Sequence, residues 1–372
     1  MRSKLVPRIA LVVFGILIAL LVLEFGARVW LNHIASEKQA RRYRLYSEMK
    51  PGDLKWSPHP YLNYTPAPNY RKGRLSHNSL GYRGPEITLN KPEGVYRIVV
   101  LGGSTVYSVS VPDNEKTFTV QLERLLDGAF DQADVQVINA GAVAYDSWNS
   151  LVNLQFRVLD LDPDLVVIHH GTNDVHARLV VPDAYRGDGT GRKKHWEPPV
   201  ASFATRHSIL WRIVARKLGI GDRPHYGLGS FIDAPTYVGA YSPNPDPTLD
   251  LMQVLRSNPP VYFRRNLINM VAVARAHGVR VVLSTWAHSP HFEDYAATPH
   301  YQQGFREIND VVREVAAEQE VPLFDFAAVM PTDKDYWDEG RHVSEAGAEF
   351  KAALFAEFIA GELGASVAPN DE

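Results

Sequence analysis

The sequence of 372 residues contains no cysteine. This absence excludes disulfide bonds, thiolate nucleophiles, iron–sulfur clusters and zinc sites that depend on cysteine. It does not identify the compartment, because many exported bacterial-type proteins also lack cysteine.

An excess of charge of one sign is lacking as well. The 39 lysine and arginine residues nearly balance the 42 aspartate and glutamate residues, which leaves a formal net charge of −3. There is no basic stripe that would indicate a nucleic-acid partner, and there is no acidic tail. Internal repeats are also absent. The length is sufficient for one large domain or two small ones.

A long hydrophobic run is present, and it lies at the N-terminus. Arg2, Lys4 and Arg8 precede an uninterrupted apolar run over residues 9–23. Counted on to Leu31, the segment has 23 residues. A helix of that length is about 34 Å long, at ~1.5 Å per residue, and can cross the ~30 Å hydrocarbon core of a bilayer.

Two interpretations of residues 1–31 are open, a signal anchor and a cleaved signal peptide. No small-x-small cleavage site follows the run, since Phe25 and His33 occupy the nearest candidate positions, so the uncleaved anchor is favoured. Glu24 and Arg28 are four residues apart and can pair on one helix face. Basic residues flank the run on both sides, which makes the positive-inside rule ambiguous. Signal-anchor logic therefore predicts a single-pass membrane protein whose body lies outside the cytoplasm, in the periplasm or the extracellular space.

Beyond the anchor the pattern changes twice. Residues 32–95 are predicted to form a juxtamembrane linker, which is polar at first and rich in proline from residue 51. Residues 96–366 alternate strands with helices, and residues 367–372 form a short tail. The strands are expected at 97–101, 135–139, 165–169, 279–284 and 321–326, and the longer helices at 148–161, 262–277, 302–319 and 344–363. This alternation predicts an α/β fold, a parallel sheet covered by helices on both faces.

One long insertion interrupts this alternation at about residues 182–260. It holds ten of the 25 prolines and one short amphipathic segment, residues 209–218. Loops of this length in compact domains are usually functional lids or disordered insertions. Because the insertion begins soon after the third strand, it is predicted to form a lid or the wall of a substrate groove. An insertion that only packs against the body is the alternative.

Chemically useful residues follow the predicted strands, at the edge where open α/β sheets bind ligands. Ser104 comes after two glycines, between a strand and a helix, which is typical of a nucleophile but also of a phosphate-binding turn or a helix cap. Gly141 ends the second strand, where its N–H could face an oxyanion or the glycine could simply turn the chain. Asn173 follows the third strand, and its amide is a neutral donor that could stabilise an oxyanion or cap a helix.

A histidine near the C-terminus could serve as the base. His342 is preceded by two acids, Glu339 three residues before it and Asp338 four residues before it. A histidine that activates serine needs a neighbouring group that fixes its tautomer and stabilises the imidazolium form. A surface histidine that caps the last helix is the alternative for this residue alone. The combination of serine, glycine, amide and histidine in this order indicates a serine esterase.

Together, Ser104, Gly141, Asn173 and His342 resemble the Ser, Gly, Asn and His for which the SGNH/GDSL hydrolase superfamily is named. The resemblance covers roughly residues 97–363. It implies a three-layer α/β/α fold with about five parallel strands in a flavodoxin-like order. It also implies that Ser104 is the nucleophile and His342 the base. The N–H groups of Ser104 and Gly141 and the Asn173 amide would form the oxyanion hole, and no metal or cofactor is implied.

The sequence departs from the family pattern in three respects. Gly103 occupies the position of the aspartate in the family name, and Ala144 stands where a second glycine often follows the Gly141 block. The Asp-x-x-His spacing is met only if Glu339 replaces the aspartate, whereas Asp338 keeps the residue type but adds one residue to the spacing. Glu339 is therefore favoured as the acid, with Asp338 as the alternative.

Four other histidines lie near predicted strand ends, namely His169, His170, His288 and His291. Their spacing is not that of tight metal ligands, so structural or substrate-contact roles are expected and no metal site is predicted.

The leading functional hypothesis is a membrane-anchored serine esterase that removes an acyl group, with acetyl favoured, from a glycan or another cell-envelope ester. The main alternative is an O-acyltransferase that moves an acyl group to a polysaccharide with the same residues. A non-catalytic binding module is less favoured because every chemical position is filled, and a nucleotide-binding flavodoxin-like domain would leave Asn173 and His342 unexplained. The expected partners are an acylated small molecule or glycan and the membrane, and not a nucleic acid. The sequence leaves the oligomeric state open.

Overall fold

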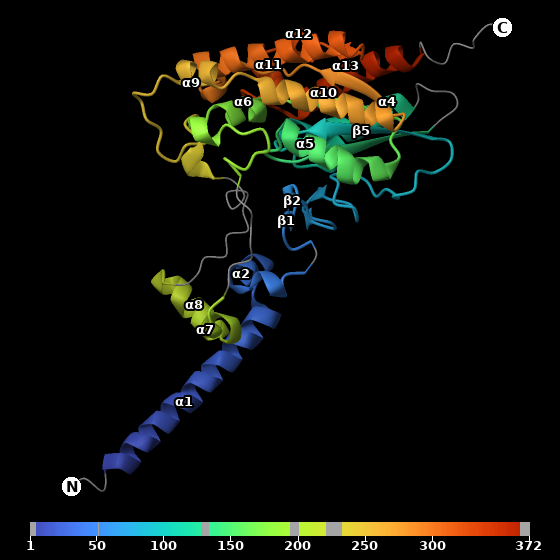
Figure 1. Cartoon of the computed structure of the whole chain (residues 1–372). Coiled ribbons are helices and arrows are strands. Elements are labelled where there is room, and N and C mark those ends of the chain that lie inside the picture. The colour runs from blue at the N-terminus through green and yellow to red at the C-terminus, as the bar shows by residue number, and fades with distance from the viewer. Residues whose placement is uncertain (1–4, 51, 128–133, 194–200, 221–232, 365–372) are drawn as a thin grey trace, which may run out of the picture. The chain divides into compact units, whose positions relative to one another are not determined.

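The computed structural model describes residues 5–50, 52–127, 134–193, 201–220 and 233–364 (Figure 1). The chain divides into two compact units. The larger unit comprises residues 55–195 and 228–372, and the smaller unit comprises residues 1–54 and 196–227. The chain therefore passes between the units three times.

A five-stranded parallel sheet forms the centre of the larger unit. Its strands are β5 (Val95–Gly102), β6 (Asp134–Gly141), β7 (Leu165–His169), β8 (Arg280–Ser284) and β9 (Leu323–Phe324). They lie in the order β6-β5-β7-β8-β9, and each neighbouring pair is parallel. The first strand of this sheet thus lies between the second and the third, which is the flavodoxin-like order. The predicted fold class is confirmed.

Helices cover both faces of this sheet, because alternate residues of a strand point to opposite sides. In β5, Val99 and Leu101 join one hydrophobic cluster, and Ile98 and Val100 join the other. The first cluster includes side chains of α10 and α11, and the second includes side chains of α4 and α13 (Figure 1). The α-helices of this unit are α3 (Ser104–Tyr107), α4 (Phe118–Asp127), α5 (Ser147–Asn153), α6 (Thr172–Arg178), α9 (Leu251–Ser257), α10 (Val261–Ala276), α11 (Pro299–Glu318), α12 (Phe326–Val329) and α13 (Glu345–Gly364).

Two elements differ from the predicted ones in detail. The helix expected over 148–161 is α5 followed by a π-helical turn, Leu154–Val158, and a 3-10 turn, Leu159–Leu161. The last strand is only two residues long, because the chain turns into α12 at Phe326. A short strand is sufficient here, since β9 is an edge strand that pairs on one side only.

Residues 55–95, which the sequence assigned to a linker, fold with the larger unit. They form two small antiparallel pairs, β1 (Trp56–His59) with β2 (Asn63–Pro66) and β3 (Arg71–Lys72) with β4 (Leu75–Ser76). Side chains then connect this segment to the loops around the sheet edge. For example, the hydroxyl of Tyr145 donates a hydrogen bond to the carbonyl oxygen of Tyr64.

Arg83 makes the most extensive of these connections. It is 2% exposed, and its guanidinium donates to the Asn114 side chain at 2.9 Å and to the carbonyl oxygens of Tyr107, Ser108 and Val111. These acceptors belong to the end of α3 and the loop that follows it. Arg83 therefore fixes the short helix that begins at Ser104.

Arg83→Ala should lower the free energy of unfolding by about 3 kcal/mol, because it leaves several buried acceptors without a donor. Urea denaturation followed by circular dichroism measures this loss. The matched control is Arg71→Ala on the exposed strand β3, which should change stability by less than about 0.5 kcal/mol. Equal effects of the two substitutions would contradict the clamping role of Arg83.

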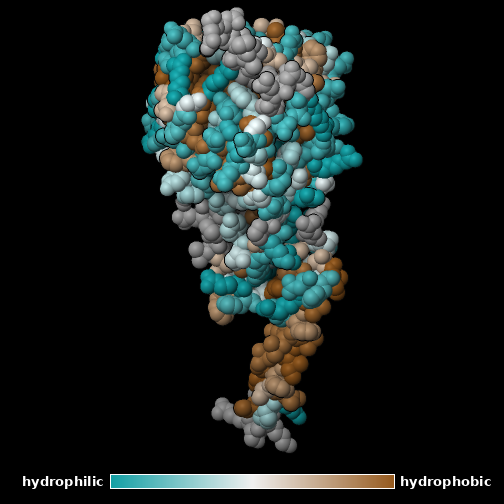
Figure 2. All heavy atoms as spheres, turned by 90° about the vertical axis from the view of Figure 1, so that its right-hand side faces the viewer, coloured by the Kyte–Doolittle hydropathy of each residue, from teal (hydrophilic) through white to brown (hydrophobic). Residues whose placement is uncertain are grey.

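The smaller unit is built on α1 (Leu5–Val29), which continues through a π-helical turn, Trp30–Ile34, to α2 (Glu37–Tyr43). Within the part of the chain that the structure describes, Val6–Ile34 is the one helix that is long and apolar enough to cross a membrane, by length and composition alone. Figure 2 shows hydrophobic side chains along most of it. A signal sequence would have the same character.

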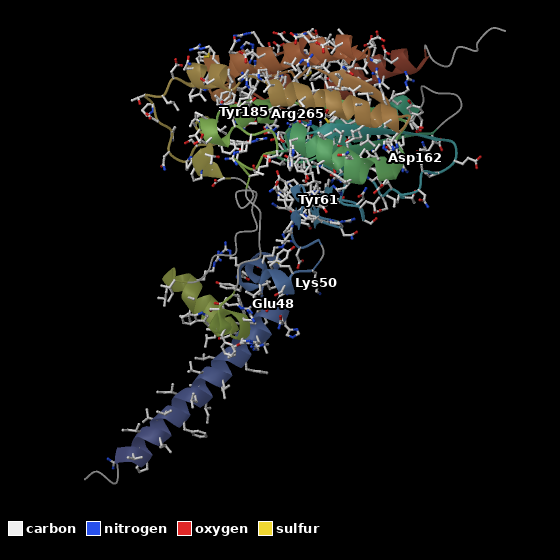
Figure 3. All side chains as sticks on the ribbon, viewed as in Figure 1. Glu48, Lys50, Tyr61, Asp162, Tyr185 and Arg265 are labelled. Carbon is white, nitrogen blue, oxygen red and sulfur yellow. The ribbon has the colours of Figure 1, made fainter. Side chains whose placement is uncertain are left out.

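The insertion at 182–260 is divided between the two units. Its helices α7 (Phe203–His207) and α8 (Ile209–Leu218) belong to the smaller unit, whereas residues 182–193 and 233–260 belong to the larger one. In the larger unit, the Tyr185 hydroxyl donates to the carbonyl oxygen of Pro259, and Arg265 donates to that of Gly187 at 2.7 Å (Figure 3). These contacts hold the first part of the insertion on the body.

Candidate active site

Ser104 lies where β5 ends and α3 begins. Its side chain is nearly buried, at 6% relative exposure, and its Oγ is 2.7 Å from His342 Nε2. The residue before it explains one departure from the family pattern. A Cβ atom at Gly103 would lie 2.6 Å from Asn173 Nδ2 and 2.9 Å from the carbonyl oxygen of Tyr145. Glycine at this position therefore allows the amide of Asn173 to approach the serine.

His342 and its acid lie on one hairpin. Strand β10 (Trp337–Glu339) pairs antiparallel with β11 (His342–Val343), and Glu339 lies opposite His342 across a two-residue turn. His342 Nδ1 contacts Glu339 Oε1. Asp338 is exposed on the same strand. Of the two acids considered from the sequence, the structure brings Glu339 to the histidine.

Glu339 is held as a carboxylate by its neighbours. Arg341 Nε lies 2.7 Å from Glu339 Oε1, and the Arg341 guanidinium lies over the ring of Tyr295, 4.2 Å from its centroid. Burial opposes ionisation of Glu339, but the hydrogen bond and charge of His342 and the charge of Arg341 outweigh it and lower the pKa of Glu339. A negative carboxylate next to Nδ1 fixes the tautomer that leaves Nε2 free to accept a proton.

Asn173 lies in the first turn of α6, directly after β7, and its amide lies beside the Ser104 turn. Its Nδ2 donates to the carbonyl oxygen of Tyr145 at 2.9 Å. Its Oδ1 accepts a hydrogen bond from the hydroxyl of Tyr241 at 3.3 Å. The amide is therefore oriented from both ends.

Gly141 is placed differently from the other predicted donors. Its N–H donates to Asn139 Oδ1 at 3.1 Å, so this group is already engaged within the sheet. Three residues later, Ala144 has a φ of +62°, in the left-handed region that favours glycine. The N–H of Ala144 has no acceptor among the described residues, and Ala144 lines a small pocket together with Asn173.

This pocket contains residues that sequence patterns did not single out. The ring of Tyr241 stacks on His176, with centroids 3.8 Å apart and planes at 15°. His176 is held in turn by the hydroxyls of Tyr295, at 3.0 Å from Nε2, and Tyr301, at 2.7 Å from Nδ1. Burial, and then the charge of Arg341, holds the pKa of His176 well below its usual value, so this histidine stays neutral. Tyrosines within a proline-rich insertion carry no motif, which is why no signal in the sequence indicated them.

Two residues that line the pocket, Asp146 and Lys193, are charged. Arg192 Nη2 and Lys193 Nζ lie 2.5 and 3.2 Å from Asp146 Oδ2. Burial opposes the charge on Asp146, but the two cations hold its pKa well below its usual value. Burial lowers the pKa of Lys193 to about 8, although Asp146 counteracts this shift. The pocket thus combines tyrosine rings with a buried ion cluster.

The other histidines noted in the sequence do not join this arrangement. His169 is buried between Ser284 Oγ, at 3.2 Å, and Lys351 Nζ, at 3.1 Å. His170 Nδ1 lies 3.4 Å from Asp174 Oδ2. His288 stacks on Trp286, and His291 lies 3.2 Å from Thr332 Oγ1. In the described ranges, no cluster of three or more histidine or acidic side chains could hold a metal ion.

The fold and this geometry define a class of protein, an α/β/α enzyme with a hydrogen-bonded serine, histidine and carboxylate at the carboxyl ends of a parallel sheet. Residues 100–350 match the GDSL-like Lipase/Acylhydrolase family. The chain therefore belongs to this family, the SGNH/GDSL hydrolases, and it is an ester hydrolase.

Solved structures with a similar fold include a lipase/acylhydrolase from Enterococcus faecalis, with 21% identity over 72% of this chain and 96% of that one, at a TM-score of 0.43. A GDSL-like lipase from Bacteroides thetaiotaomicron is 16% identical in sequence, over 73% of this chain and 89% of that one, at a TM-score of 0.39. A mutant of an acetyl-xylooligosaccharide esterase from Geobacillus is 14% identical in sequence, over 71% of this chain and 94% of that one, at a TM-score of 0.42. A search among proteins of curated function gives no match.

Glu339→Gln should reduce turnover by about 10³–10⁴-fold, because an amide no longer stabilises the imidazolium form of His342. Asp338→Asn is the matched control and should stay within about twofold of the unchanged enzyme, since single changes at exposed positions are usually mild. Initial rates of p-nitrophenyl acetate hydrolysis measure both. The reverse order of effects would transfer the role to Asp338, and two mild effects would indicate a dyad without an acid.

Proposed function

We propose that this protein is a membrane-anchored serine esterase that removes a small acyl group, with acetyl favoured, from a glycan or another cell-envelope ester. The observation that carries the catalytic part is the chain of contacts from Ser104 Oγ through His342 to Glu339. Family membership supplies the reaction class, ester hydrolysis.

In the first half of the proposed reaction, Ser104 Oγ attacks the ester carbonyl carbon and gives its proton to His342 Nε2. The Glu339 carboxylate stabilises the imidazolium that forms. His342 then gives the proton to the departing alcohol, which leaves the acyl group on Ser104. In the second half, His342 takes a proton from water, which attacks the acyl-enzyme and releases the carboxylic acid. The serine recovers its proton from His342.

The oxyanion of each tetrahedral intermediate needs donors on the side of Ser104 where Asn173 lies. We assign this role to Asn173 Nδ2, to the Ser104 N–H and to the N–H of Ala144 in preference to that of Gly141. Two observations support this choice: the Gly141 N–H is used by Asn139, and the Ala144 N–H has no acceptor in the described part of the chain. A donor of this kind contributes about 10²–10³ in rate.

The surroundings of Asn173 support a small acyl group and a polar alcohol. The pocket beside it is narrow, since Tyr64, Tyr237 and Tyr241 line it together with Asp146 and Lys193. The space between these side chains is small, which favours a small acyl group over a long one, and the charged groups favour a polar alcohol such as a sugar hydroxyl. Tyr237 and Tyr241 come from the insertion, which favours the proposal that residues 233–241 form one wall of the substrate groove.

The membrane part of the proposal depends on α1. Its length and composition suit a span, and we propose that it stays attached as an anchor, with the catalytic unit outside the cytoplasm. A cleaved signal peptide is the competing interpretation.

Ser104→Ala should reduce hydrolysis of p-nitrophenyl esters to near the uncatalysed rate, because no acyl-enzyme can form. With the unchanged enzyme, kcat/KM should fall from acetate to butyrate to octanoate, since the pocket is narrow. Partition of the acetyl group to an added oligosaccharide, instead of to water, would indicate an acyltransferase. Esterase activity that persists in Ser104→Ala, with a serine-directed phosphonate still bound covalently, would disprove the assignment of the nucleophile.

Ala144→Gly should retain or raise turnover, because glycine adopts the left-handed conformation of this residue without strain. Ala144→Val should lose about 10²-fold or more, because a β-branched residue opposes this conformation and displaces the N–H donor. Asn173→Ala should lose about 10²–10³-fold with an unchanged circular dichroism spectrum. Full activity of Ala144→Val would return the backbone role to Gly141.

A further inference from the structure

We propose that α7 and α8 form a lipid-contacting element that lies in the membrane interface beside the end of α1. The inference rests on the membrane anchor proposed above, and it is independent of the ester chemistry. Two sets of observations carry it, both within the smaller unit. One is the set of contacts that fix α8 on α1 and α2, and the other is the character of the side chains that α8 leaves exposed.

A single carboxylate holds the N-terminus of α8 on α1. Glu24 accepts hydrogen bonds from the N–H groups of Ile209, at 3.0 Å, and Leu210, at 2.9 Å, and from the Ser208 hydroxyl at 2.8 Å. Arg28, one turn further along α1, pairs with the same carboxylate at 2.8 Å. A carboxylate suits this place because the first N–H groups of a helix have no partner within the helix.

Apolar packing and a second ion pair complete the attachment. Ala27 and Leu31 are buried against Ile209, in a small cluster of their own. On the next turn of α8, Arg212 donates to both carboxylate oxygens of Glu48, at 2.6 and 2.8 Å, just beyond α2 (Figure 3). The buried face of α8 is thereby assigned to α1 and α2, which determines the face that is left outside.

The position of this contact along α1 corresponds to a membrane surface. The apolar run begins at Ile9, and Arg28, the partner of Glu24, lies 19 residues further along the helix, with Glu24 one turn earlier. At ~1.5 Å per residue, 19 residues span about 28 Å, close to the ~30 Å thickness of the hydrocarbon core. The N-terminus of α8 therefore lies at the depth where α1 leaves the lipid tails.

The outer face of α8 is apolar. Trp211, Val214 and Leu218 recur at spacings of three and four residues, and they are 38%, 39% and 65% exposed. Phe203 of α7 is 81% exposed and adds another large apolar side chain to the exposed surface of these two helices. Exposed aromatic and aliphatic side chains in a row are costly in water, and they are typical of helices that lie in a bilayer interface.

Charge supports lipid as the occupant of this face. Residues 201–220 contain no aspartate or glutamate, whereas Arg206 of α7 and Lys217, next to Leu218 of the stripe, are exposed. Basic residues beside an apolar stripe are attracted to anionic lipid headgroups. A protein partner would explain an apolar stripe, but it would not explain why the stripe begins at the depth where a membrane span ends.

The absence of cysteine allows a direct test with single nitroxide labels on the full-length chain in phosphatidylethanolamine–phosphatidylglycerol vesicles. Val214→Cys and Leu218→Cys probe the apolar stripe. Arg216→Cys is the matched control, because it lies about 160° around the helix from Leu218 at about 100° per residue. Gly15→Cys, in the middle of α1, reports the anchor itself.

The measured quantity is the ratio of the label's collisions with oxygen, which concentrates in lipid, to its collisions with a water-soluble nickel complex. We expect this ratio to be several-fold higher at Val214→Cys and Leu218→Cys than at Arg216→Cys. Aqueous values at all three positions, with a lipid value at Gly15→Cys, would overturn the inference and leave the anchor intact. Protection of the stripe from both reagents would mean that protein covers it, and would overturn it too. An aqueous value at Gly15→Cys would reject the anchor and the inference together, while p-nitrophenyl acetate hydrolysis on the same samples tests the esterase separately.

Glu24→Ala, added to Leu218→Cys, tests the attachment. It should move the label toward the aqueous value, because the N-terminus of α8 loses its acceptor. Lys50→Ala, at an exposed position of the same unit, is the control and should leave the label in lipid. Hydrolysis of soluble p-nitrophenyl acetate should be unchanged in both variants, and equal label movement in both would contradict the role of Glu24.

Discussion

The register of three neighbouring strands is the constraint on which the site depends. Gly102 at the end of β5 pairs with Gly141 of β6 on one side and with His169 of β7 on the other. Because these strands run parallel and end level with one another, the residues that follow them emerge at one edge of the sheet. Ser104 and Asn173 are therefore neighbours in space. A slip of two residues in one pairing would separate them while preserving the hydrophobic pattern of the core.

The base, His342, and its acid, Glu339, lie on one hairpin and so come to this edge of the sheet together. A hairpin with a two-residue turn places Glu339 opposite His342, and Arg341 in the turn returns to the same carboxylate. Only the docking of the hairpin against Ser104 is then left to tertiary packing. The amide of Asn173 is oriented by a residue from a distant part of the chain, Tyr241, so the insertion completes a site that the sheet begins.

Much of the fold could be predicted because the sequence patterns that indicate it are local. Alternating strands and helices predicted the parallel sheet, and three short motifs at strand ends, together with the histidine near the C-terminus, indicated the family. The oxyanion-hole donor after the second strand was harder to predict. Motif spacing does not reveal that the Gly141 N–H donates to Asn139 Oδ1, or that Ala144 has a backbone in the left-handed region. Tyr241 and the split of the insertion between two units depend on contacts between distant segments, for which a single sequence carries no periodic signal.

The attachment of α8 to α1 also sets an order of events during synthesis. Glu24 and Ser208 are separated by 184 positions in the chain. At about 5–20 residues per second, α8 follows its partner out of the ribosome by about 10–40 s. During that interval the carboxylate of Glu24 has only nearby groups such as Arg28 to pair with. The first helix to be made thus waits for a segment far along the chain, and the smaller unit can form only after three of the five strands of the sheet, β5, β6 and β7, have been synthesised.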